Sequence, residues 1–416
     1  MTTRNGNTLL LVAFVAIVVL RMPHILFGGG RFWAEEGVVY FTGALTRAWY
    51  EAWFLIHTGY INLAAGFGAW LGLRLGGILH APLVTVLFAL AIQTLPAWIA
   101  LTHDFPWRRS LIASASAVAL IAIPPVTGEV WLNTITSQFH LALASALIYA
   151  SAERRRGLAG FDCAILAFAV MSGPATSFLT PFFVFEAVRR RDRASVIQAA
   201  ILCLGLSIQL VIFLLHPLAS RGAPLPPDEI LSAISLHTIV LQFAGIGPAS
   251  AFAKHLLARY HEHRTLWQGP LLLALYYGVV AVGIGRARNA TLARLQLAGL
   301  VIALVSFREA LAGSFDGFMQ VVADQRYAFV PMVINALVLV GLAAGPRDAW
   351  RRAFALPVAV LLIVGAIDFR LGLALFRTGP AWQPQVVLWK HDAKLTVRVW
   401  PGGVWVMTMP ASAGRD

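Results

Sequence analysis

The chain has 416 residues, of which 59% are hydrophobic and 12% are charged. A soluble domain carries about 25% charged residues, so this composition excludes an ordinary water-soluble fold. The net charge of +13 does not indicate a nucleic-acid partner. The arginines instead lie in short clusters between apolar runs, as in the cytoplasmic loops of membrane proteins. We therefore predict an all-α polytopic membrane protein whose partners are membrane lipids and not nucleic acid.

The first apolar run, residues 8–27, predicts a retained transmembrane helix with a cytoplasmic N-terminus, because it lacks the small-residue cleavage site of a signal peptide. Residues 28–79 follow as a long outer loop with two helix-like stretches, 35–56 and 60–78. We expect both stretches to lie flat at the membrane interface. The alternative for the second stretch is a true crossing, which would place neighbouring basic clusters on opposite sides of the membrane.

The basic clusters predict the remaining topology if all of them are cytoplasmic, because an even number of crossings must then separate neighbours. The clusters are Arg4; Arg108 and Arg109; Arg154 to Arg156; Arg189 to Arg193; Arg286 to Arg294; and Arg347 to Arg352. The predicted crossings are 8–27, 80–102, 110–126, 134–152, two short helices within 158–188, 195–217, 267–285, 293–313, 326–345 and 354–375. The two short helices turn at Ser172-Gly173-Pro174. Residues 235–252 lie on the outer surface or enter and return. The prediction is about eleven transmembrane helices.

This topology predicts one transmembrane domain, residues 1–375, followed by a short extracytoplasmic tail, residues 376–416. In the tail, apolar and polar residues alternate over 395–400 and end at Pro401-Gly402-Gly403, which predicts a short strand. Cys163 and Cys203 fall within apolar runs and are expected to be free thiols.

The strongest local motif is Phe32-Trp33-Ala34-Glu35-Glu36-Gly37, directly after the first helix. Two adjacent carboxylates repel each other and cost stability unless they have a use. A carboxylate at this position can take a proton from an attacking hydroxyl or ligate a hard divalent cation. The alternative is a solvated pair beside Arg31 and Arg47.

Glu129 is the second candidate acid, because it follows Pro124-Pro125 at the outer end of a predicted helix. With Asn133 and Gln138 it could bind acceptor hydroxyls, or it could share a cation with Glu35. The alternative is an acidic residue placed at a helix start by the helix dipole.

Arg326 opens a late helix at the predicted outer face, in Asp324-Gln325-Arg326-Tyr327. A guanidinium suits a phosphodiester because it grips two oxygens through charge-assisted hydrogen bonds. The alternative is an interfacial arginine paired with Asp324. Four further ionisable residues near outer helix ends could line a cavity: Arg21, His24, Arg308 and Glu309. The histidines of 255–263 lack zinc-like spacing, so no metal site is predicted there.

These motifs together resemble the GT-C superfamily of integral-membrane glycosyltransferases. The resemblance rests on the acidic pair in the first outer loop, the two surface helices that follow it and the series of hydrophobic passes. It extends to Gly59-Tyr60, the segment 128–133, Arg326-Tyr327 and the tail motif 400–403. One departure is that many relatives have Asp-Glu where this chain has Glu-Glu, so either glutamate could be the base.

The resemblance implies transfer of a sugar from a polyprenyl-phosphate-linked donor to an envelope acceptor on the extracytoplasmic side of a bacterial inner membrane, with inversion at the anomeric carbon. It implies Glu35 or Glu36 as catalytic base. The expected substrate-binding residues are Arg326, Tyr327, Glu129, Asn133, Gln138 and Arg31. A divalent cation is compatible with this site but not required by it.

Two other functions remain as alternatives. A transporter, flippase or polysaccharide-assembly protein would need polar residues along a path across the whole membrane. Here the polar residues other than arginine cluster in the outer half, and no internal repeat is found, which favours a one-sided active site. The third alternative is a non-catalytic relative that scaffolds an envelope complex.

Overall fold

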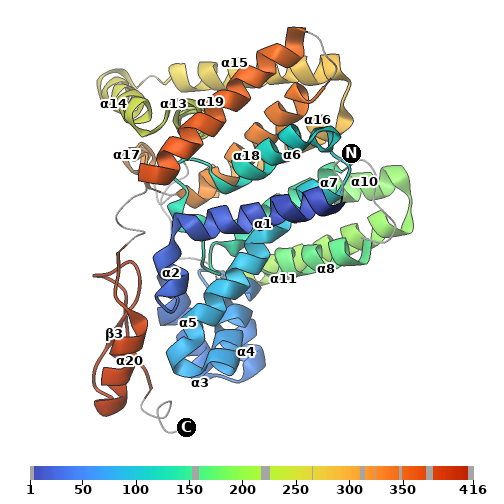
Figure 1. The fold of residues 1–416 in the computed structure, drawn as a ribbon. Coiled ribbons are helices and arrows are strands. Elements are labelled where there is room, and N and C mark those ends of the chain that lie inside the picture. The colour runs from blue at the N-terminus through green and yellow to red at the C-terminus, as the bar shows by residue number, and fades with distance from the viewer. Residues whose placement is uncertain are drawn as a thin grey trace.

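The computed structural model describes residues 4–151, 159–216, 225–264, 266–309, 314–323, 325–345, 349–371 and 378–410. Figure 1 shows an all-α molecule in which long helices run roughly side by side, with the small C-terminal elements set to one side of them. Three positions used in the topology prediction lie outside the described residues: the cluster at 154–156, Arg347 and Asp324.

Eleven helices make up the main body. They are α1 (Arg4–Arg21), α5 (Leu63–Thr102), α6 (Leu111–Ala122), α7 (Ser137–Ala150), α8 (Ala159–Val170), α10 (Thr180–Arg190), α11 (Arg193–Leu215), α15 (Gln268–Ala287), α16 (Ala290–Glu309), α18 (Gln325–Ala343) and α19 (Ala349–Leu371). Other helices lie between them along the chain: the short α2 (Pro23–Phe27), α9 (Pro174–Ser177), α12 (Pro227–Ser235), α13 (Leu241–Ala244) and α17 (Phe315–Phe318), and the longer α14 (Ile246–His263). A π-helical turn, Leu236–Val240, joins α12 to α13.

Among the described residues, six helices are long enough and apolar enough to cross a membrane, or seven if the bent pair α8 and α10 counts as one span. The prediction of eleven crossings is therefore not supported by helix length. The predicted crossing at 110–126 forms α6, whose 12 residues span about 18 Å against a hydrocarbon core of about 30 Å. The predicted crossing at 134–152 forms α7, with 14 residues.

Helix α5 contains the second stretch of the first outer loop and the crossing that follows it. Its backbone leaves the helical conformation at Gly77, where φ is +57°. The hydroxyl of Thr85 donates to the carbonyl of Gly68, 17 positions earlier, at 3.4 Å. These residues would lie about 26 Å apart in a straight helix, so the segment before Gly77 folds back on the segment after it. The predicted boundary between the stretch 60–78 and the crossing 80–102 is therefore present, and it is a reversal of the chain at Gly77.

The first stretch, predicted as one helix over 35–56, is instead divided into short pieces. A π-helix, η1 (Glu36–Phe41), continues into α3 (Thr42–Thr46), and α4 (Trp49–Trp53) follows. A hairpin then pairs β1 (Ile56–His57) with β2 (Tyr60–Ile61). Its two-residue turn has positive φ at both Thr58 and Gly59, the combination that type I′ hairpin turns require.

The predicted turn at Ser172-Gly173-Pro174 separates α8 from α9 and α10, and the chain bends by 119° there. Gly173 has φ +139°, a backbone conformation that is open to glycine and costly for other residues. The chain reversal places the short helix α9 beside α7 and α11.

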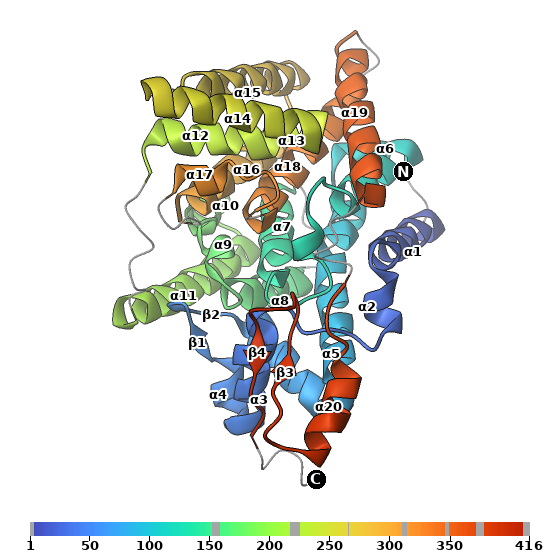
Figure 2. The same cartoon turned by 90° about the vertical axis from the view of Figure 1, so that its left-hand side faces the viewer.

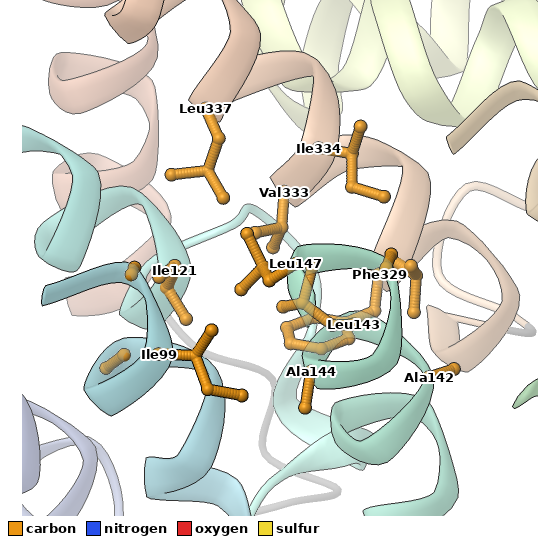
Figure 3. Packing of buried hydrophobic residues seen from close by; sticks show 14 of the residues in the cluster. Ile99, Ile121, Ala142, Leu143, Ala144, Leu147, Phe329, Val333, Ile334 and Leu337 are labelled. Carbon is orange, nitrogen blue, oxygen red and sulfur yellow. The ribbon is translucent and has the colours of Figure 1, made fainter. Parts of the chain in front are cut away.

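The core lies where α5, α6, α7 and α18 meet. Figure 3 shows aliphatic and aromatic side chains of these helices converging, among them Ile99, Ile121, Leu143, Phe329 and Val333. Every residue of α7 is buried. In the most apolar stretch of α18, 83% of the residues are buried, against 28% in α11 and 22% in α15. Helix α18 is therefore the centre of the bundle, and α11 and α15 present most of their surface outward.

The C-terminal tail forms α20 (Trp382–His391) and a small hairpin of β3 (Val397–Arg398) with β4 (Val406–Met407). The strand predicted over 395–400 is thus present but shorter. Figure 2 shows the tail lying alongside α3 and α5. The indole N–H of Trp382 donates to the carbonyl of Ile78 at 2.8 Å, which joins the tail to α5 just after the Gly77 reversal.

Candidate functional site

A cavity of about 660 Å³ is lined by residues of the first loop, the hairpin and several helices. Its wall contains both polar and apolar side chains. It is lined by Glu35 and Tyr40; His57, Thr58, Gly59 and Tyr60; Ile135, Thr136, Gln138 and Phe139; Pro174, Ala175, Ser177 and Phe178; Leu206, Gln209, Leu210 and Phe213; Ser306; and Arg326 and Tyr327. Four of the eight predicted site residues therefore meet in one cavity.

Glu35 lines the cavity and is half-buried. Within the described part of the chain, no hydrogen bond or ion pair engages its carboxylate. Burial lowers the pKa of the neighbouring His57, and the Glu35 carboxylate opposes that shift. Burial also raises the pKa of Tyr40, with smaller contributions from Tyr60 and Glu35. Among the described residues, the Glu35 carboxylate is thus open to a ligand, and the His57 imidazole and the Tyr40 phenol lie near it.

Glu36 has the opposite environment, because it is completely buried and does not line the cavity. One carboxylate oxygen accepts from the backbone N–H of Thr134 at 2.7 Å and from the hydroxyl of Thr134 at 2.5 Å. The other accepts from the backbone N–H of Trp33 at 2.9 Å. Burial raises the pKa of Glu36, against these hydrogen bonds and the charge of Arg31. Glu36 therefore ties the first loop to the segment before α7.

Arg326 lines the cavity, and its guanidinium donates to the carboxylate of Glu129. The side chain of Arg326 is 37% exposed, whereas that of Glu129 is 12% exposed. The guanidinium carbon also lies 5.0 Å from the ring centroid of Tyr327. Glu129, predicted as the second acid, is therefore the partner of Arg326, predicted as the phosphate-binding residue. Arg326 lines the cavity and Glu129 does not.

Asn133 shapes the loop before α7 and does not line the cavity. Its amide N–H donates to the carbonyl of Glu129 at 2.8 Å, and its oxygen accepts from the hydroxyl of Thr136 at 2.7 Å. Gln138 does line the cavity, and its amide donates to the hydroxyl of Tyr60 at 3.4 Å. Among the described residues, no donor reaches the Gln138 oxygen, so this oxygen is available to a bound hydroxyl.

Arg31 is 1% exposed and lies outside the cavity lining. Its guanidinium lies over the rings of Trp33 and Trp400, at 4.6 Å and 4.9 Å. One N–H donates to the carbonyl of Trp131 at 3.3 Å. Burial lowers the pKa of Arg31 to about 9, and Glu36 opposes this shift. Arg31 thus joins three segments of the chain beneath the site.

Of the four ionisable residues predicted near outer helix ends, Arg21, His24 and Arg308 do not line the cavity, and the side chain of Glu309 lies outside the described part of the chain. Arg21 instead forms an ion pair with Asp368 at 3.5 Å and donates to the hydroxyl of Thr127 at 3.3 Å. His24 stacks on Trp400, with ring centroids 5.9 Å apart. These two residues hold the loop before α7 and the C-terminal tail in place.

The sequence motifs included Gly59-Tyr60 but did not indicate His57, Thr58 or the α11 face as part of the cavity wall. The amide of Gln209 donates to the carbonyl of Ile61 at 3.0 Å, and its oxygen accepts from the N–H of the same residue at 3.0 Å. This pairing attaches the hairpin to α11 and brings His57 and Tyr60 to the cavity. A glutamine within a long apolar run is costly without a partner. Gln209 was therefore the sequence feature that could have indicated a contact between this helix and another polar segment.

The side chains do not fit the predicted shared cation. Glu129 is engaged by Arg326, and only Glu35 of the two carboxylates lines the cavity. Within the described ranges, no group of three or more His, Cys, Asp or Glu side chains is placed to hold a metal ion. No step of the proposed reaction therefore passes through a metal.

The described residues define an all-α membrane protein with a partly polar cavity near one end of its helices. No protein-family model matches the sequence, and no curated protein matches it. Among solved structures, the chain is similar to ArnT from Cupriavidus metallidurans in the apo state, with 14% sequence identity over 80% of this chain and 77% of that one. The TM-score is 0.31, which is too low to establish a shared fold, so neither fold nor function is inferred from the similarity.

Proposed function

We propose that this protein is a membrane glycosyltransferase that moves a sugar from a polyprenyl-phosphate-linked donor to an acceptor hydroxyl on the extracytoplasmic side of a bacterial inner membrane. The acceptor is an envelope glycan or lipid. The observation that carries the proposal is the shared cavity of Glu35 and Arg326. An unpaired carboxylate and a partly exposed guanidinium are the two charges that this transfer needs.

Glu35 acts as the general base. Its carboxylate takes the proton of the acceptor hydroxyl while the hydroxyl oxygen attacks the anomeric carbon of the donor sugar. The bond from that carbon to the phosphate oxygen breaks as the new glycosidic bond forms. The proton ends on Glu35, and the prenyl phosphate leaves with one additional negative charge. A single displacement of this kind inverts the anomeric configuration.

Arg326 stabilises the leaving phosphate. Its guanidinium provides paired N–H groups to two phosphate oxygens, and the attraction strengthens as charge develops on the leaving group. In the structure this arginine donates to Glu129. The donor phosphate therefore exchanges with, or adds to, the Glu129 carboxylate as the partner of Arg326.

The apolar wall of the cavity supports a lipid-linked donor. Leu206, Leu210 and Phe213 line the cavity from α11. Leu210 and Phe213 are 52% and 47% exposed, on a helix whose most apolar stretch is only 28% buried. The α11 part of the cavity wall thus includes side chains that are also exposed on the outside of the bundle. A prenyl chain beside α11 would bring its phosphate toward Arg326.

The first experiment measures transfer of radiolabelled sugar from purified polyprenyl-phosphate sugars to crude envelope acceptor. Glu35→Gln removes the base and is expected to lower transfer by about 10²–10⁴-fold. Arg326→Gln removes the phosphate contact and is expected to lower transfer by about 10²-fold or more. Both variants should be expressed at the wild-type level and elute at the same position in size-exclusion chromatography.

The matched control for these variants is Arg47→Gln, which alters a charged residue of the same loop outside the cavity lining. It should transfer at the wild-type rate. If Glu35→Gln transfers as well as the wild type does, the proposed mechanism is wrong. If donor lipid crosses the bilayer of reconstituted vesicles without any glycosidic product, the flippase alternative replaces it.

A further inference from the structure

We propose that Trp400 of the C-terminal tail is a positioning residue for Glu35, so that the tail completes the active site. The inference rests on the function proposed above and extends it to a segment about 365 residues downstream of the acid. Trp400 itself does not line the cavity. It acts through the backbone of the first loop.

Trp400 pairs with the residues directly before Glu35. Its backbone N–H donates to the carbonyl of Phe32 at 3.1 Å, and its carbonyl accepts from the N–H of Ala34. The two segments form a parallel β-bridge between Trp33 and Trp400. The two peptide groups on either side of Trp33 are therefore held by the tail, as far as the N–H of Ala34, the residue before Glu35.

Ala34 shows why this bridge matters. Its φ is +48°, in the left-handed region, which costs conformational free energy for a residue with a side chain. The surrounding structure must supply this energy. This conformation turns the chain so that Glu36 points into the protein and Glu35 points toward the cavity. The hydrogen bond from Ala34 to Trp400 lies at the residue that makes this turn.

The two glutamates depend on the bridge to different degrees. Glu36 is held by three hydrogen bonds of its own. The Glu35 carboxylate has no such restraint among the described residues. The position of Glu35 is therefore set by its backbone, and that backbone is set on its N-terminal side by the bridge to Trp400.

The side chain of Trp400 fixes the tail in register. Its indole lies over the Arg31 guanidinium at 4.9 Å, and its N–H donates to the carbonyl of Pro380 at 2.9 Å. A Cβ at Gly379 would lie 2.3 Å from the indole, so the ring fills the space that the missing side chain leaves. Val399 packs against Gly37 in the same way, because a Cβ built at Gly37 would lie 2.8 Å from a side-chain methyl of Val399.

The direct test uses a thiol at the position of the acid. Glu35→Cys is made in a chain with Cys163→Ala and Cys203→Ala, and its rate of alkylation by a membrane-impermeant maleimide is measured. Adding Trp400→Ala should change this rate by at least threefold, and adding Trp400→Phe, which keeps a ring over Arg31, should change it less. The control is Val404→Ala, an 82% exposed position of the same tail, which should leave the rate unchanged.

A second measurement uses the intact acid. Trp400→Ala with Glu35 present should lower kcat for sugar transfer by about 10²-fold, because a misplacement of about 1 Å has that effect, with KM within twofold of the wild type. Trp400→Phe should recover most of kcat. If Trp400→Ala does not fold, as judged by size-exclusion chromatography, Val399→Ala and Trp400→Phe provide milder perturbations of the packing between the tail and the first loop.

The outcomes separate the two proposals. An alkylation rate and a kcat that both stay within twofold of the Val404→Ala control would overturn the positioning role. A raised KM with unchanged kcat would also overturn it, because Trp400 would then act on substrate binding alone. An altered alkylation rate in a protein whose wild type transfers no sugar would support the positioning role and count against the glycosyltransferase.

Discussion

The adjacent residues Glu35 and Glu36 have different roles in the structure although the sequence makes them look equivalent. Glu35 lines the cavity without a partner among the described residues, whereas Glu36 is buried and accepts three hydrogen bonds. A sequence can identify the acidic pair, because two carboxylates after a transmembrane helix are unusual. It cannot separate them, since the separating partner, Thr134, is 98 positions away.

The two glutamates therefore predict opposite mutant phenotypes. Glu36→Gln leaves a buried backbone N–H without an acceptor, so we expect a loss of about 1–3 kcal/mol in the free energy of unfolding. Glu35→Gln should change that free energy by less than about 0.5 kcal/mol, as surface substitutions do. Denaturant unfolding in detergent, followed by tryptophan fluorescence, measures both. Equal losses in the two variants would contradict this assignment.

The raised pKa of Glu36 predicts a pH dependence of stability. Burial raises its pKa above the ordinary value of 4.5, so the folded protein keeps this proton at a pH where the unfolded chain has lost it. The contribution to the free energy of unfolding is then largest below pH 4.5 and is lost as the pH rises through the folded-state pKa. In the wild type, the melting temperature should therefore fall as the pH is raised from 4.5 through the folded-state pKa of Glu36. In Glu36→Gln the same series should be flatter, and an unchanged slope would rule out Glu36 as the source.

At the scale of elements, glycines decide where the chain reverses. Gly77 and Gly173 both have positive φ, but their surroundings differ. A Cβ at Gly77 would meet nothing within 4 Å, whereas a Cβ at Gly173 would lie 2.0 Å from the side-chain oxygen of Gln138. The sequence predicts the turn at Gly173 because a proline follows it. At Gly77 no proline follows directly, so the apolar run predicts a boundary near residues 78–80 but not that the chain folds back there.

Substitution of these two glycines by alanine should therefore have unequal effects. Gly77→Ala meets only the backbone cost of its glycine-type conformation, φ +57° and ψ −170°, which is about 1–3 kcal/mol. Gly173→Ala adds a steric clash with Gln138, and we expect a loss larger by at least 1 kcal/mol. Thermal unfolding in detergent compares them. Because Gln138 lines the cavity, Gly173→Ala should also reduce sugar transfer, and Gly77→Ala should not.

At the scale of the whole molecule, basic clusters and apolar runs predict the order of the helices, whereas helix length supports six or seven of the eleven predicted crossings among the described residues. The eleven predicted runs each contain a helix, yet α6 and α7 are short. Their shortness reflects the irregular segment between them, which is buried in the protein. Non-helical backbone is tolerated at membrane depth only where protein covers it, and hydropathy does not reveal that cover.

The predicted topology, with a cytoplasmic N-terminus and an extracytoplasmic tail, has a direct test. Val404 and Arg109 are both exposed and lie on opposite sides of the membrane in this topology. In a chain without native cysteines, Val404→Cys should react with an impermeant maleimide added to spheroplasts. Arg109→Cys should react only after the cells are opened. Labelling of both from the outside would contradict the predicted orientation.

The central position of α18 has a consequence for how the chain is made. It packs against α6, α7, α16 and α19, and three of these four are translated before it. Until the ribosome has released residues 325–343, the faces of α6 and α7 that contact α18 lack this partner, although α1, α5 and α16 are already present. During biogenesis there is therefore a stage at which the central position of the bundle is not yet occupied. Helix α18 must insert into this position from the translocon after most of the other helices have been made. Nascent chains that stop before this helix should be substrates for membrane quality-control proteases.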